Sequence, residues 1–282
     1  MTKVSSMKFI KQFFLYSILL LPQFSTAQTD WLIQPIQQKA NINIQDNYIE
    51  LNNGLAKRIF YIGPNLACID YTNLSNGQQL LRSIEPEARV VIDGQMYNIG
   101  GLIGQTEKAY LIKGSEKKLL SDNNAFQFKG YHIDTIAHYI QWKSTTWNSN
   151  KNQAKGKSIR FDFIVPNNHL SNLTISVHYN LYDGIPLITK WIEIKNNGEQ
   201  KVKINRVVNE VLGLVEEESA VVGKPEVMKK QHGIYVETNY AFNNAMRYDI
   251  SDQTTHWKID SSYTSQVNYN YETPCLLEIY PE

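Results

Sequence analysis

The sequence has few cysteines, little net charge and none of the short motifs that mark common catalytic folds. Lys and Arg number 28 among its 282 residues and Asp and Glu number 27, so the formal net charge is +1. No segment gathers enough charge of one sign to hold a phosphate backbone, and nucleic acid is not an expected partner. The sequence lacks a nucleophile elbow, an HExxH helix, a phosphate-binding loop and a GxGxxG turn. Residues 100–104 are rich in glycine but have no Lys to reach a phosphate, which favours a structural loop.

The two cysteines, Cys68 and Cys275, lie near opposite ends of the chain. In an exported protein they could form a disulfide, which would close a long loop and stabilise the fold by about 4–5 kcal/mol on the chain-entropy model. A buried free thiol is the alternative for Cys68, because its neighbours are apolar. Neither cysteine has a second Cys or a His at ligand spacing, and the six histidines are scattered without a carboxylate cluster. We therefore predict neither a metal site nor a cofactor.

The first 27 residues differ from the rest of the chain. Lys3, Lys8 and Lys11 form a basic start, residues 13–21 are almost wholly apolar, and residues 25–27 are small. This pattern is typical of a cleaved secretion signal, and the apolar run is shorter than the roughly 20 residues that span a bilayer. We predict a signal peptide at residues 1–27 and an exported mature chain, periplasmic or extracellular, with no membrane association after cleavage. An uncleaved anchor is the alternative.

Beyond the signal, short runs rich in Ile, Val, Tyr, Phe and Thr are separated by Asn-Gly, Asp-Gly and Pro-Asn turns. This spacing predicts antiparallel strands, and the expected ranges are 48–51, 56–62, 66–71, 89–92, 96–99, 133–142, 158–165, 173–182, 187–194 and 202–211. Strands do not alternate with long helices, so a parallel α/β fold is not expected. We predict one all-β domain over residues 28–282, a large antiparallel β-sandwich. A split at the polar stretch 148–157 is the alternative.

Aromatic side chains are the first candidates for ligand contact. Trp142 and Trp147 bracket a polar segment that begins with Lys143, and such a pair could stack on a sugar ring while its neighbours meet the hydroxyl groups. Packing in the core is the alternative for both. Trp191 lies in a run that alternates charged and apolar residues, so we expect it in the core.

Carboxylates are the second group of candidates, because glycoside cleavage needs two of them about 5–10 Å apart. The sequence gives no reason to choose a pair, and most of the candidates lie next to turns, where Asp bonds to its own backbone. We assign no catalytic residue. The carboxylates considered are Asp134, Asp162, Asp183, Glu193 and Glu210.

Three blocks of the sequence resemble one known family. They are residues 51–60 (LNNGLAKRIF) followed by 64–67 (PNLA), residues 179–191 (YNLYDGIPLITKW), and residues 266–275 (QVNYNYETPC). Together they are similar to the amino-terminal β-supersandwich domain of glycoside hydrolases related to family 36, the α-galactosidase or melibiase-like group, whose sandwich is galactose mutarotase-like.

The resemblance implies a noncatalytic domain. In that family the catalytic carboxylates belong to a (β/α)₈ barrel that follows the sandwich, and this chain carries none of them. The implied role is to frame a carbohydrate, an α-galactoside or a related oligosaccharide, and to support a downstream catalytic domain. A free-standing sugar-binding module and a mutarotase-like epimerase are the alternatives. An epimerase would use a His with a carboxylate. The family's usual Asn-His motif has only a weak match in this sequence, at Asn168-His169.

Overall fold

The computed structural model describes residues 30–137, 154–165, 169–215, 233–239, 254–262 and 275–281. It divides the chain into two compact units, Met1–Gln34 and Pro35–Glu282. In the first unit the described residues, 30–34, form a turn in which the carbonyl of Asp30 accepts hydrogen bonds from the backbone of Ile33 and Gln34. All the strands belong to the second unit.

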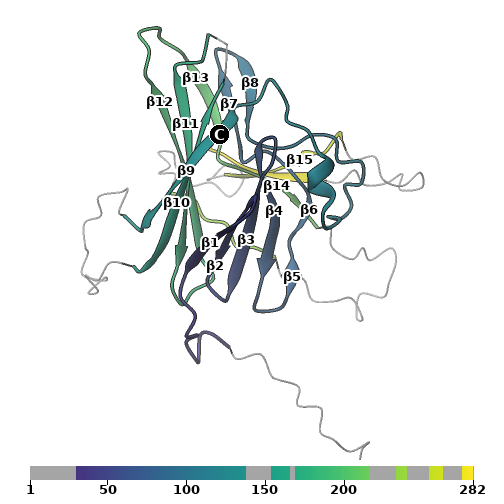
Figure 1. Cartoon of the computed structure of the whole chain (residues 1–282), viewed down its shortest axis with the longest axis vertical. Coiled ribbons are helices and arrows are strands. Elements are labelled where there is room, and N and C mark those ends of the chain that lie inside the picture. The colour runs from purple at the N-terminus through teal and green to yellow at the C-terminus, as the bar shows by residue number, and fades with distance from the viewer. Residues whose placement is uncertain are drawn as a thin grey trace, which may run out of the picture. The chain divides into compact units, whose positions relative to one another are not determined.

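The described residues form sixteen strands in four sheets, and every pairing between these strands is antiparallel (Figure 1). The first sheet contains, in spatial order, β1 (Asn41–Gln45), β2 (Tyr48–Asn52), β3 (Ala56–Ile62), β4 (Leu66–Asn73) and β5 (Gln78–Gln79). The second contains β12 (Ile188–Asn196), β11 (Leu173–Tyr182), β10 (Gly156–Ile164) and β9 (Gln127–Thr135). The third contains β13 (Ile204–Val208), β7 (Ala88–Ile92) and β8 (Gln95–Ile99). The fourth contains β15 (Thr255–Ile259), β16 (Cys275–Ile279), β14 (Glu210–Leu214) and β6 (Leu81–Ser83), and one 3₁₀-helix, η1, spans Ser115–Lys118.

The core lies between the β1–β5 sheet and the β9–β12 sheet, because alternate residues of their strands are apolar and share one face. Phe60 of β3, Phe161 of β10 and Tyr179 of β11 are fully buried there. The ring centre of Phe60 lies 4.9 Å from that of Phe161 and 5.1 Å from that of Tyr179, and the rings are tilted or edge to face. Truncating a buried aromatic of this kind to Ala costs about 3–5 kcal/mol. This aromatic triangle therefore holds the two largest sheets together.

Asn53 joins the β2–β3 turn to the β11–β12 turn. Its Oδ1 accepts hydrogen bonds from the backbone of Leu55 and Ala56, while its Nδ2 donates to the carbonyls of Tyr182 and Ile185 at 2.7 Å each. The side chain is fully buried, so all four bonds replace contacts with water. The two turns are far apart in the sequence, and one amide connects the ends of both sheets.

The prediction of an all-β antiparallel domain is confirmed. The expected strands at 56–62 and 173–182 have the bounds of β3 and β11. The expected Asp93-Gly94 hairpin joins β7 and β8, and its two residues have φ of 50° and 83°, as a type I′ turn requires.

The finer prediction of two extended sheets differs from the structure, in which four sheets form a propeller-like arrangement (Figure 1). The strand expected at 202–211 breaks at Asn209, because β13 pairs with β7 whereas β14 pairs with β16 and β6. The backbone amide of Asn209 donates to the carbonyl of Ile279, and its Nδ2 donates to the carbonyl of Lys190. These bonds divert the chain from one sheet to the next.

Candidate functional site

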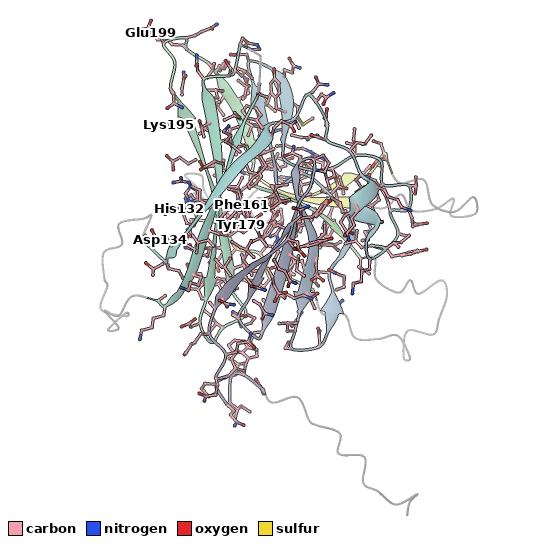
Figure 2. All side chains as sticks on the ribbon, in the orientation of Figure 1. His132, Asp134, Phe161, Tyr179, Lys195 and Glu199 are labelled. Atoms are coloured by element: carbon pink, nitrogen blue, oxygen red, sulfur yellow. The ribbon has the colours of Figure 1, made fainter. Side chains whose placement is uncertain are left out.

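The face of the β9–β12 sheet that points away from the core is lined by polar side chains. Phe161 of β10 and Tyr179 of β11 point into the core. Side chains alternate between the two faces along a strand, so the residues directly before and after each of them point to the opposite face. Figure 2 shows His132 and Asp134 at the outer side of this sheet, with Phe161 and Tyr179 toward the interior. We call the side of this sheet that points away from the core the outer face. The strand register arranges its residues in three rows that run across β9, β10, β11 and β12. These rows are Asp134, Ser158, Asn180 and Thr189; His132, Arg160, His178 and Trp191; and Gly130, Asp162, Ser176 and Glu193.

The size of the outer face follows from strand geometry. Neighbouring strands lie about 4.8 Å apart and alternate residues about 6.8 Å apart, so four strands and three rows cover roughly 14 Å by 14 Å. Gly130 leaves one corner without a side chain, and a Cβ placed there would have no atom within 4 Å. The outer face is therefore a broad polar surface with one open corner.

An ion pair lies at the centre of the outer face. Nε of Arg160 lies 3.0 Å from Oδ1 of Asp162, and its Nη2 donates to Oδ2 at 3.1 Å. The hydroxyl of Ser176 donates to Oδ1 of the same carboxylate at 2.6 Å. The side chain of Arg160 is 43% exposed, which leaves part of the guanidinium open to solvent. This cluster can both donate and accept hydrogen bonds.

His178 is stacked on Trp191 beside that cluster. The two ring centres are 4.6 Å apart and the planes differ by 13°. Nε2 of the imidazole lies 3.5 Å from Oε2 of Glu193, a long ion pair when the ring is protonated. Burial lowers the pKa of His178 and outweighs the opposing effect of the Glu193 carboxylate. The imidazole is therefore favoured in its neutral form, as a flat ring with one donor and one acceptor nitrogen.

Asn180 is fully buried in the row next to that of His178, and neither its Oδ1 nor its Nδ2 has a hydrogen-bond partner among the described residues. A buried polar atom without a partner costs about 1–3 kcal/mol, and native proteins contain few of them. The outer face therefore holds a donor and an acceptor that the fold itself does not use.

A buried charge cluster lies on the core side of the same sheet. Arg58 donates to both carboxylate oxygens of Glu210 at 2.8 and 3.1 Å, and Nζ of Lys190 lies 2.7 Å from Oε1 of Glu210. The hydroxyl of Tyr179 donates to Oε2 of Glu87 at 2.5 Å. The residues come from β3, β11, β12, β14 and the segment before β7, so the cluster connects strands of different sheets.

The buried charge cluster holds its charges by mutual neutralisation. Burial acts to raise the pKa of Glu210, but Arg58 and Lys190 outweigh it and the pKa is lowered. Burial lowers the pKa of Lys190, against the opposing effect of Glu210 and Glu87. The adjoining cavity measures about 10 Å³, the space of one water molecule. It cannot hold a sugar, so this cluster is structural.

The Trp142–Lys143–Trp147 prediction lies outside the described residues and stays a prediction. Cys68 is a buried free thiol, and burial raises its pKa to about 12 although Arg58 acts to lower it. The structure thus shows the free-thiol alternative for Cys68, and the side chain of Cys275 lies outside the described residues.

Of the five candidate carboxylates, three lie together on the outer face: Asp134, Asp162 and Glu193. The other two have structural contacts. Glu210 is buried in the charge cluster, and Oδ1 of Asp183 accepts a hydrogen bond from the backbone of Ala40.

Most of the outer face could not be recognised from the sequence, and the prediction for Trp191 was wrong. We expected Trp191 in the core, but it is paired with His178 on the outer face, while Lys190 points into the core with a side chain only 6% exposed. Alternation shows that two faces differ but not which of them is buried. The neutralisation of Lys190 by Glu210 could not be predicted from residues that are 20 positions apart.

Among the described residues, no group of His, Cys, Asp and Glu side chains is arranged to bind a metal ion, and no helix has the length and apolarity to cross a membrane. The predicted signal, residues 1–27, lies outside them, so cleavage and export stay predictions. No family model, no curated protein and no solved structure matches the chain.

Proposed function

We propose that the chain is the noncatalytic amino-terminal domain of an exported α-galactosidase-like glycoside hydrolase. It frames a carbohydrate substrate and supports a downstream (β/α)₈ barrel. One observation carries the proposal: the segments 51–60 and 179–191, which carry the family resemblance, meet in space through Asn53. Two blocks far apart in the sequence thus form one structural unit. The resemblance implies a mutarotase-like supersandwich as the parent architecture. In its support, the β1–β5 and β9–β12 sheets pack on each other through Phe60, Phe161 and Tyr179, although the described strands also form two further sheets.

The surroundings of Asp162 and Glu210 favour a noncatalytic role for these two carboxylates. A glycosidase needs one carboxyl group as an acid and a second one free to act as a base or nucleophile. Asp162 is held by Arg160 and Ser176, and Glu210 is buried between two cations. Both groups serve contacts within the protein, which suits a framing domain better than bond cleavage.

The test is to extend the reading frame beyond Glu282 and compare two proteins, the mature chain alone and the mature chain with the downstream segment attached. We expect the extension to alternate strands and helices, with Asp residues at strand ends. Hydrolysis of a nitrophenyl α-galactoside should require the extension. An extension without that alternation, or hydrolysis by residues 28–282 alone, would refute the proposal.

The mutarotase-like alternative has one observation in its favour. His178 lies 3.5 Å from Glu193, the combination of base and acid that ring opening of an aldose needs. His169, in the segment that first suggested this activity, is exposed. The test is to follow the mutarotation of freshly dissolved α-galactose by polarimetry. If the mature chain accelerates it, and His178→Ala abolishes the acceleration while His169→Ala preserves it, the epimerase is supported. If the mature chain does not accelerate it, the epimerase is excluded.

A further inference from the structure

We propose that the outer face of the β9–β12 sheet is the sugar-contacting surface of this domain and that it takes a neutral pyranose. The inference rests on the proposed function and goes further, because it names the site, its residues and the chemical class of the ligand. It depends on the arrangement of charge, on one flat stacked pair and on an amide that the fold leaves unused.

The charged groups in the three rows of the outer face occur as three pairs, each with one acid and one base. Asp162 is paired with Arg160, Glu193 with His178 at 3.5 Å, and Asp134 with His132 at 3.9 Å. The two histidines carry charge only when they are protonated, so the three carboxylates outnumber the one permanent cation, Arg160, and the surface disfavours an anion. A hydroxyl group both donates and accepts, so it can bond to either member of such a pair. A neutral polyhydroxylated ligand fits this pattern better than a phosphate or an acidic sugar.

The ring stack gives the outer face its flat apolar element. His178 is stacked on the Trp191 indole, and the strand register places His178 directly opposite Arg160, with Trp191 on its other side. Sugar sites combine an apolar ring face with polar groups that orient the hydroxyls. Both kinds of group therefore lie within one lattice of strand positions, about 5–7 Å apart.

Asn180 supplies the second, independent observation. Its amide is fully buried on the outer-face side of β11, between Ser158 and Thr189, and neither polar atom has a partner in the part of the chain that the structure describes. One donor and one acceptor on the same planar amide match two adjacent hydroxyls of a pyranose, one accepting and one donating. The cost of leaving them unpaired in the free protein is regained when a ligand satisfies them.

The central experiment uses Asn180→Leu in the mature chain, because stability and binding should then change in opposite directions. An apolar group of similar shape removes the unsatisfied amide, so the melting temperature should stay equal or rise. Affinity for methyl α-galactoside or an α-1,6-galactosyl oligosaccharide, measured by calorimetry, should fall about tenfold or more. A variant that melts lower and binds as before would overturn the inference, since the amide would then be purely structural.

A matched pair of carboxylates provides the control. Glu193→Gln and Glu199→Gln make the same change on β12 and in the turn just after it, and Figure 2 shows Glu199 beyond the end of the sheet. Only Glu193→Gln should weaken binding. Amide shifts on titrating the unmodified chain with the sugar provide a readout without mutation, and they should concentrate in residues 130–134, 158–162, 176–180 and 189–193.

Three results would overturn the inference and leave the proposed function intact. Binding that is lost in Trp142→Ala but kept in Asn180→Leu and Glu193→Gln would place the sugar elsewhere. Tighter binding of galacturonate than of galactose would contradict the neutral class. No binding of any of these sugars at millimolar concentration would remove the site, while the framing role would still be decided by the extended protein.

Discussion

Substituting Glu210 with Gln tests the buried charge cluster most directly. The carboxylate accepts from both Arg58 and Lys190, and the side chains of all three are less than 10% exposed. Glutamine has nearly the same shape and keeps one acceptor oxygen, so the change removes charge and little volume. Arg58 then loses its carboxylate partner, and Lys190 is left with Glu87, whose Oε2 lies 3.9 Å from its Nζ.

The expected loss follows from the burial of the pair. Removing one partner of a buried ion pair costs about 3–5 kcal/mol, whereas an exposed pair contributes about 0–1 kcal/mol. A domain of this size loses about 2–4 °C of melting temperature per kcal/mol, so the midpoint should fall by roughly 6–20 °C. The effect should shrink in acid. The folded-state pKa of Glu210 lies below its ordinary value of 4.5, so its contribution is present above that pH and is lost as the pH falls through the folded value.

Urea unfolding followed by circular dichroism at pH 7 and pH 4 measures both effects. Arg58→Met should be as damaging as Glu210→Gln, while Lys57→Met on the same strand should cost less than about 1 kcal/mol, because the Lys57–Asp70 pair is partly exposed. The double variant Arg58→Met/Glu210→Leu should cost less than the sum of the single changes. The reasoning is wrong if Glu210→Gln unfolds within about 0.5 kcal/mol of the parent chain.

Three further predictions concern other contacts. The thiol of Cys68 should not react with a thiol reagent in the native chain at pH 8, because burial raises its pKa to about 12, and it should react once urea unfolds the domain; fast native labelling would contradict this. Asn53→Ala removes four buried hydrogen bonds and leaves the Tyr182 carbonyl without its side-chain donor, so we expect the free energy of unfolding in urea to fall by about 2–4 kcal/mol. A fall of less than about 1 kcal/mol would mean that the two turns are held together without Asn53. Burial holds the pKa of His178 below its ordinary value of 6.5, so the domain should lose stability as the pH falls below 6.5, and His178→Gln should reduce that loss. If the dependence of stability on pH is the same in the variant, protonation of this imidazole is not coupled to folding.

The sequence predicted the strands well where one face is apolar and the turn chemistry is strong. β3 and β11 have the predicted bounds because each is bordered by turns that contain Asn-Gly, Gly-Pro or Asp-Gly. β15 was missed because its residues are mostly exposed, and Trp257 and Ile259 give no buried face to recognise. The number of sheets was also not predicted, since a break such as that at Asn209 depends on which distant strand is available for pairing.

The candidate site was less predictable than the fold. Asp134, Asp162 and Glu193 were considered as candidates, but only the strand register shows that they share a face. Asn180 gave no signal at all, because an Asn beside a turn is ordinary in sequence and becomes unusual only when its amide is found buried without a partner.

Lys190 and Trp191 are adjacent in sequence and belong to opposite sides of one sheet, the first to the buried charge cluster and the second to the outer face. The register between β11 and β12 sets which of them points inward. A slip of that register by a single residue would exchange the two, placing an indole among carboxylates and an ammonium in solvent. Any residue inserted into the loop of residues 183–187 must therefore be absorbed within the loop, so that the strand register stays unchanged.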